Sequence, residues 1–237
     1  MAETLVLIHG TNGSGAETEP LARRLPPGID TFAPDWLGHG GRPAPDEDYG
    51  MDAIVDDLAL SLDRRRIDRC FLFGYSIGGY AALVLAHRYP ERVRGIVTLA
   101  TRHLWHARGV AHLVHLATPE RLMRPGNPRA AELAAIHHPT DWRRVNAANR
   151  MLFARLGEAP PLSEADLRAI AVPVLVLNGT ADPLVPEEET RALAALFPTW
   201  RLGLFEGSAH PFHQTPLDDI ATATAGFIGD VAALERA

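Results

Sequence analysis

Ser76 is the residue whose neighbours in the sequence point most directly to chemistry. It is the third residue of the pentapeptide GYSIG (residues 74–78), which follows an apolar run at 70–73 and precedes a helix-like stretch at 80–86. A serine with glycines two residues away on each side, at a turn from strand to helix, is typical of a nucleophile elbow. Side chains at those two positions would collide with the strand and the helix. We therefore predict that Ser76 holds its hydroxyl out toward a substrate as a nucleophile.

A nucleophilic serine needs a base and a group that orients the base, because its hydroxyl reacts poorly at neutral pH. Residues 173–178 read as a buried strand and lead into a loop that carries Asp182, the predicted acid. Residues 200–205 read as another strand, and the segment after them carries His210, the predicted base. The chain order Ser76, Asp182, His210 differs from the orders in chymotrypsin-like and subtilisin-like proteases.

Each partner of Ser76 has a rival in the sequence. His213 is a second histidine close to His210, but His210 is the one that follows the glycine-bearing turn at the strand end. Asp35 also lies at a strand end, but it precedes the serine, contrary to the expected order. We therefore keep His210 and Asp182.

The negatively charged oxygen that forms during acyl transfer needs fixed N–H donors. Residues 4–8 read as a strand that runs into the glycine-rich loop 9–15. We predict that the backbone N–H groups of Thr11 and Ile77 form the oxyanion hole. A glycine-rich loop after a first strand could instead cradle phosphate, but this loop has neither of the two nucleotide-binding spacings.

Five motifs in the same order resemble those of the α/β-hydrolase superfamily, and the resemblance covers nearly the whole chain. They lie at residues 9–10, 35–40, 74–79, 179–186 and 207–211. The chain is most similar to the small, cap-bearing branch of serine esterases and C–C hydrolases. The sequence departs from that pattern at Arg42 and Ala209, neither of which belongs to the predicted triad.

The resemblance implies an α/β fold with a doubly wound, mostly parallel sheet of about six strands and helices on both faces. It also implies a helical cap inserted after the sixth-strand region. We place the core at residues 1–100 and 162–237 and the cap at residues 101–161. No cofactor and no metal are expected. His112 and His115 have a spacing that can ligate zinc, but no HExxH pattern is present.

The predicted cap is helical and rich in arginine, with nine arginines and four acidic residues between 101 and 161. One helix is expected to open with Asn127 as its cap and Pro128 as its first residue. A second is expected from Asp141 to Leu156, capped by Thr140 and ended at Gly157. Arginines on a solvated helix face and apolar residues packed on the body explain most of this composition. The candidates for substrate contacts in the cap are Trp105, Met123, Arg124, Trp142 and Arg150.

The composition of the chain excludes some classes of function. The chain has 237 residues, of which 46% are hydrophobic, so it can bury a full core. A net charge of −6 argues against nucleic acid as a partner. No apolar run approaches about 18 residues, so no membrane span is expected. Cleavage of a leader would remove the loop that begins at His9, so we expect a cytoplasmic protein. Cys70 is the only cysteine and reads as a core residue.

The sequence therefore predicts a serine hydrolase that cleaves a small carboxylic ester or lactone through an acyl-enzyme. Two alternatives remain open. One is a C–C hydrolase or enol-lactonase acting on small anionic substrates, which is favoured if cap arginines face the pocket. The other is a hydrolase-fold ligand receptor with little turnover. The oligomeric state is left open.

Overall fold

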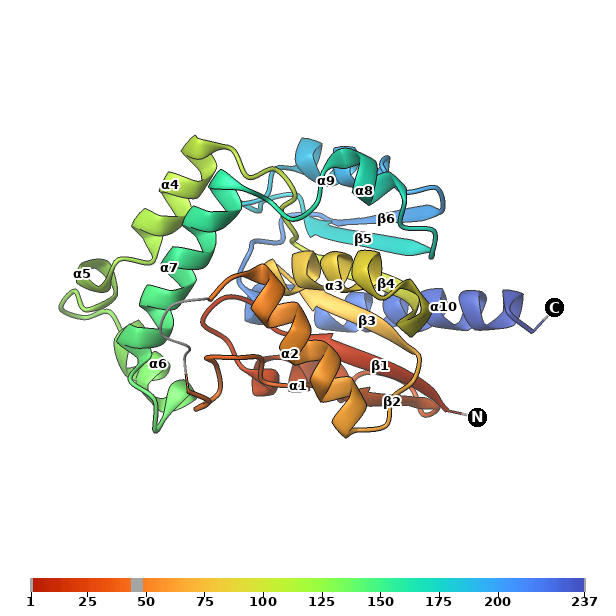
Figure 1. Ribbon diagram of the computed structural model, residues 1–237, viewed down its shortest axis with the longest axis horizontal. Coiled ribbons are helices and arrows are strands. Elements are labelled where there is room, and N and C mark those ends of the chain that lie inside the picture. The colour runs from red at the N-terminus through yellow and green to blue at the C-terminus, as the bar shows by residue number, and fades with distance from the viewer. Residues whose placement is uncertain (1, 44–48, 237) are drawn as a thin grey trace.

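A six-stranded parallel sheet forms the centre of the protein (Figure 1). The computed structural model describes residues 2–43 and 49–236. The strand order is β2-β1-β3-β4-β5-β6, and all five neighbouring pairs run parallel. This confirms the predicted fold class. The strands are β1 (Glu3–Ile8), β2 (Ile29–Phe32), β3 (Cys70–Tyr75), β4 (Val93–Leu99), β5 (Val174–Gly179) and β6 (Trp200–Phe205).

Helices cover both faces of the sheet, because the central strands are apolar on both sides. Alternate residues of each strand point to opposite faces, so Val6 and Ile8 join one core while Leu5 and Leu7 join the other. The first core is closed by α2 (Met51–Arg64), α3 (Ile77–Arg88), α8 (Glu164–Arg168) and α9 (Glu187–Ala194). The second is closed by α1 (Glu19–Ala22) and α10 (Leu217–Leu234). Short 3-10 turns lie at Gly15–Thr18, Pro90–Arg92 and Phe212–Gln214.

A group of four helices between β4 and β5 lies beside the sheet as a separate layer (Figure 1). The insertion thus follows the fourth strand of this chain, whereas the prediction placed it after a sixth-strand region. The difference arises because β1 here is the strand directly before the loop 9–15. We call these helices the cap: α4 (Ala107–Leu116), α5 (Pro119–Leu122), α6 (Arg129–His137) and α7 (Trp142–Glu158).

The two predicted cap helices exist, but their ends differ from the prediction. Helix α6 begins at Arg129, whose backbone N–H donates to Asn127 Oδ1 at 3.0 Å. Helix α7 is capped by Asp141, which accepts from the N–H of Arg143, and not by Thr140. Gly157 does not end α7. A Cβ there would lie 3.0 Å from Val110 Cγ2 of α4, so glycine serves the close packing of α4 on α7.

No helix in the described part of the chain combines the length and the apolar character needed to cross a membrane.

Candidate active site

The turn from β3 to α3 holds Ser76 in a strained conformation. Its φ is +54° and its ψ is −121°, a backbone conformation that residues other than glycine rarely adopt. The glycines around it are a steric requirement. A Cβ on Gly74 would overlap the backbone of Gly78 and Gly79, and a Cβ on Gly78 would overlap the carbonyls of Ile8 and His9. The predicted elbow is therefore present in the fold.

The three residues predicted to form the triad lie together at the carboxyl ends of the strands. Ser76 Oγ is 3.1 Å from His210 Nε2, and His210 Nδ1 is 2.7 Å from Asp182 Oδ2. The other Asp182 oxygen, Oδ1, accepts the backbone N–H groups of Leu184 at 2.7 Å and Val185 at 3.0 Å. With both carboxylate oxygens engaged, Asp182 is held in place and can orient the imidazole.

The rival acid and base occupy other positions. Asp35 Oδ1 accepts the N–H of Gly15 at 2.6 Å, so this carboxylate braces the loop 9–15. His213 lies on the wall of the cavity next to Ser76, where its Nε2 is 3.3 Å from Gln214 Nε2. Neither is hydrogen bonded to Ser76 or to His210.

The two predicted oxyanion donors, Thr11 and Ile77, line the same cavity as Ser76. Ile77 is the first residue of α3, so its N–H lies outside the hydrogen bonds of the helix itself. Thr11 lies in the loop 9–15, and both residues line the cavity. The loop is closed on itself, since Gly13 N donates to Gly10 O at 3.1 Å and Gly10 N donates to Glu17 Oε2 at 3.1 Å. Thr11 therefore lies on a turn that its neighbours fix.

A buried polar network links this loop to the cap. The side-chain amide of Asn149, on α7, lies 2.9 Å from Asn12 Oδ1 and 3.1 Å from His39 Nε2. Trp36 Nε1 donates to His39 Nδ1 at 2.6 Å. Asn12 has a φ of +59° and follows Thr11 directly, so α7 contacts the loop one residue from a proposed oxyanion donor.

Three buried histidines surround this network and are kept neutral. Burial lowers the pKa of His9 to about 4. Burial also lowers the pKa of His39 and of His137, and the nearby histidines add to the effect at His39. The ring centres of His9 and His39 are 5.2 Å apart, and those of His39 and His137 are 5.5 Å apart. A proton on any of these rings would be poorly solvated.

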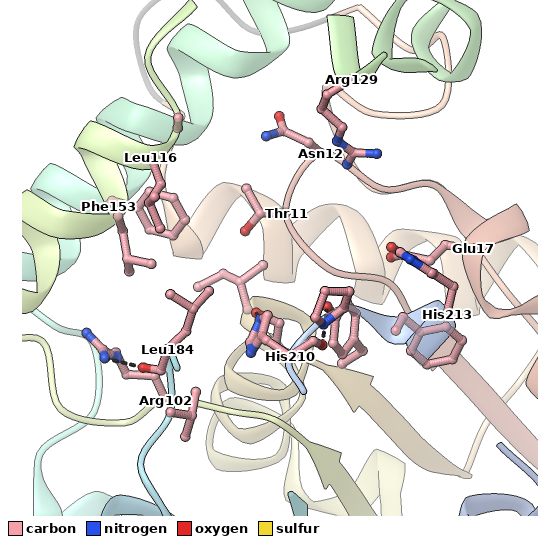
Figure 2. Close-up of a pocket in the computed structure, with 18 of the residues that line it drawn as sticks. Thr11, Asn12, Glu17, Arg102, Leu116, Arg129, Phe153, Leu184, His210 and His213 are labelled. Carbon is pink, nitrogen blue, oxygen red and sulfur yellow. Dashed lines mark hydrogen bonds between the residues drawn. The ribbon is translucent and has the colours of Figure 1, made fainter. Parts of the chain in front are cut away.

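A cavity of about 470 Å³ opens at Ser76 between the body and the cap (Figure 2). Trp105, a predicted substrate contact, is on its wall. The other four predicted contacts, Met123, Arg124, Trp142 and Arg150, are not among the residues that line it. Trp142 is buried and lies beneath the guanidinium of Arg143, while Met123 is exposed and its sulfur contacts the same arginine. These four residues are therefore not placed to contact a substrate in this cavity.

Several wall residues are not among the five predicted substrate contacts. Arg102 belongs to the arginine-rich segment 101–161 and follows the carboxyl end of a parallel strand, where ligands often bind. Its guanidinium donates to Leu184 O and lies 3.8 Å from Glu189. Glu17, Arg129 and the apolar residues of α4 gave no signal, because their orientation depends on how the loop and the cap pack. The apolar wall residues from α4 to α5 are Leu113, Leu116, Ala117 and Leu122.

No group of three or more His, Cys, Asp or Glu side chains within residues 2–43 and 49–236 is arranged to hold a metal ion.

Comparison with known families and proteins gives a consistent assignment. The profile of a family described as the alpha/beta hydrolase fold matches residues 3–157. The chain is 30% identical over 245 residues to a poly(3-hydroxyalkanoate) depolymerase of Ectopseudomonas oleovorans, covering 92% of this chain and 82% of the relative. It is 27% identical over 242 residues to a pimeloyl-[acyl-carrier protein] methyl ester esterase of Aromatoleum aromaticum, covering 90% and 94%.

Solved structures share the fold at lower identity. A meta-cleavage product hydrolase from Pseudomonas fluorescens superposes with a TM-score of 0.80 at 21% identity, covering 97% of this chain and 91% of that one. At this identity the similarity establishes the fold alone.

Proposed function

Because the chain belongs to the α/β-hydrolase fold family, we propose that it is a serine hydrolase that cleaves small carboxylic esters or lactones through an acyl-enzyme on Ser76. The observation that carries the proposal is the chain of contacts at the cavity floor. Ser76 Oγ is 3.1 Å from His210 Nε2, and His210 Nδ1 is 2.7 Å from Asp182 Oδ2. These are the distances expected of a nucleophile, its base and the residue that orients the base.

In the first half of the reaction, His210 Nε2 takes the Ser76 proton as Oγ attacks the ester carbonyl. Asp182 holds the Nδ1–H tautomer and stabilises the imidazolium that forms. The carbonyl oxygen becomes an oxyanion, which the N–H groups of Thr11 and Ile77 bind. The bond from carbon to the alkoxy oxygen then breaks, and His210 gives its proton to the departing alcohol.

In the second half, water attacks the acyl-enzyme from the place that the alcohol has left. His210 takes a proton from the water and returns it to Ser76 Oγ as the acid leaves. The reaction needs only water as a co-reactant, and every proton passes through His210 Nε2.

The lining of the cavity supports an ester or a lactone over a small anion. Two arginines are on the wall, but each has an acidic neighbour. Arg102 lies 3.8 Å from Glu189, and Arg129 lies 3.2 Å from Glu132. Of the cap arginines on which the C–C hydrolase alternative depends, Arg102 and Arg129 line the cavity, whereas Arg124 and Arg150 do not. Much of the wall from α4 and α7 is apolar, which suits an acyl chain.

The first test is the release of p-nitrophenol from acetyl, butyryl and octanoyl esters by the wild type and by Ser76→Ala. Both proteins are compared at equal folded concentration, checked by circular dichroism. We expect repeated turnover by the wild type and background release by the variant. Equal rates for the two proteins would exclude Ser76 as the nucleophile. A single burst without further turnover would favour the receptor alternative.

A further inference from the structure

The cavity has two chemically different ends on either side of the triad. Figure 2 shows Leu116, Phe153 and Leu184 at one side of His210 and Thr11, with Arg102 bonded to the backbone of Leu184. On the other side lie Asn12, Glu17, Arg129 and His213. The apolar end suits an acyl chain, but the polar end has no role in the reaction described above. We call this second group the polar end of the cavity; Glu132, which pairs with Arg129, lies beside it on the wall.

In the polar end, the carboxyl group of Glu17 is held in place by the backbone of the loop 9–15. Its Oε2 accepts the backbone N–H of Gly10 at 3.1 Å. The loop also wraps the carboxyl closely, since a Cβ on Gly13 would overlap Glu17 Oε2. The second oxygen, Oε1, has no hydrogen-bond partner among the described residues, and the side chain lines the cavity. A carboxyl held by one oxygen, with the other free at the cavity wall, is placed to bind a ligand.

We propose that Glu17 binds a hydroxyl group on the alcohol part of the substrate, so that the preferred substrates are esters of small diols or polyols. The inference rests on the proposed ester hydrolysis and adds the chemical class of the leaving group.

The position of the polar end assigns it to the leaving group. His210 must hand its proton to the departing alkoxy oxygen, so the alcohol lies on the His210 side of Ser76. Glu17 and His210 both line the cavity, and Tyr75, which packs against Gly10, donates its hydroxyl to His210 O at 2.9 Å. His213 follows His210 by three residues and lies on the same stretch of wall. The alcohol that leaves Ser76 therefore meets Glu17.

Charge in the polar end favours a hydroxyl over an ion. Arg129 and Glu132 pair at 3.2 Å and balance each other's charge, so Glu17 alone decides whether this end of the cavity carries a net charge. Burial raises the pKa of the Glu17 carboxyl, so its protonated form is more populated than in an exposed glutamate. The protonated form can donate a hydrogen bond as well as accept one. A hydroxyl also donates and accepts, and it pairs with either form of the carboxyl.

The test compares 2-hydroxyethyl butyrate with n-propyl butyrate, whose alcohols have the same number of heavy atoms. Initial rates are followed by pH-stat for the wild type, Glu17→Leu and Glu132→Leu. We expect kcat/KM of the wild type to favour the hydroxyl ester by about tenfold, the value of one hydrogen bond to a carboxyl group. In Glu17→Leu the ratio should fall to about one. In Glu132→Leu, the matched control on the same end of the cavity, the ratio should stay near the wild-type value.

The ratio separates recognition from support of the loop. If Glu17 only braces Gly10, its replacement slows both esters equally and leaves the ratio unchanged, which overturns the proposal. A wild-type preference for carboxymethyl butyrate that Arg129→Gln removes would also overturn it, because the polar end would then bind anions. If the wild type hydrolyses neither butyrate nor the p-nitrophenyl esters, the proposed function itself fails.

A second measurement needs no variant, in case Glu17→Leu does not fold. The butyryl-enzyme formed from p-nitrophenyl butyrate is allowed to partition between water and an added alcohol. At equal concentration, and after correction for its two hydroxyls, ethylene glycol should accept the acyl group about tenfold more often than 1-propanol. Equal transfer to the two alcohols would contradict a hydroxyl site beside the leaving group.

Discussion

The body wall and the cap wall of the cavity are built in different ways. On the body side, hydrogen bonds hold the functional groups: the backbone of Leu184 and Val185 holds Asp182, and Asp182 holds His210. On the cap side, the wall is made of side chains of amphipathic helices, and buried polar links such as those of Asn149 and His137 connect these helices to the body. Hydrogen bonds thus hold the proposed catalytic groups on the body side, whereas packing sets the shape of the cavity on the cap side.

The largest loss of activity is expected from replacing Asp182 on the body side of the cavity. In Asp182→Asn, one oxygen would still accept the N–H groups of Leu184 and Val185, so an NH₂ group would face His210 Nδ1. The imidazole would then be held in the wrong tautomer, with its proton on Nε2. We expect kcat for p-nitrophenyl butyrate to fall about 10⁴-fold with little change in the melting temperature.

Asp35→Asn is the matched control, since Asp35 is the other carboxylate that was considered from the sequence. It accepts the N–H of Gly15 at 2.6 Å and has no contact with His210. Its replacement should leave kcat within about tenfold of the wild type. If kcat falls more in Asp35→Asn than in Asp182→Asn, then Asp35, and not Asp182, is the acid that orients His210.

The second effect concerns the buried histidines where the two walls meet. The pKa of His9 is lowered to about 4 in the folded protein, against 6.5 in the unfolded chain. Protons therefore bind the unfolded chain more strongly, so the stability that His9 contributes is present above pH 6.5 and is lost as the pH falls toward 4. His39 and His137 act in the same direction. At pH 5, His9 alone should lower the free energy of unfolding by about 2 kcal/mol.

Urea unfolding of the wild type and of His9→Gln at pH 7.5, 6 and 5 measures this effect. The wild type should lose stability more steeply than the variant between pH 6.5 and pH 5. Parallel curves would mean that His9 accepts a proton in the folded state without cost, and that its burial does not hold it neutral.

The sequence predicted the positions of the triad residues better than the roles of residues that depend on helix packing. Ser76, Asp182 and His210 stand at strand ends, and parallel strands bring their carboxyl ends to one edge, so spacing alone indicated that they meet. The role of Gly157 was predicted wrongly, as a helix end, because the packing of α4 on α7 decides it and the local sequence does not show that packing. Likewise the sequence indicated a strand before Asp35 but not the bounds of β2, because this four-residue edge strand has two exposed residues and carries little apolar pattern.

The third prediction tests whether the cap also shapes the body side. In Asn149→Ala, the loop 9–15 loses its only hydrogen bond to α7 among the described residues. Because Asn12 follows Thr11, the N–H of Thr11 should become less well aimed at the oxyanion. A complete donor is worth about 2.7 to 4 kcal/mol, and a loosened one should cost about tenfold in kcat with little change in KM.

Asn146→Ala provides the control for this variant. Asn146 is also on α7 and fully buried, but its side-chain amide has no hydrogen-bond partner among the described residues. Removing it disturbs the same helix without touching the loop. Equal losses of kcat in the two variants would show that α7 acts only through general packing.

The smallest effect should come from the apolar wall of the cap. Leu116 is half-buried at the end of α4 and lines the cavity, so it can contact a substrate without holding the core together. Leu116→Ala removes about three carbon atoms from that wall, of which a flexible acyl chain covers only a part. We expect kcat/KM for the octanoyl ester to fall about fivefold, while the acetyl ester, too short to reach α4, is unchanged. An equal fall for both esters would mean that the acyl chain does not run along α4. The apolar and polar ends would then have exchanged roles, and the acyl group would face Glu17.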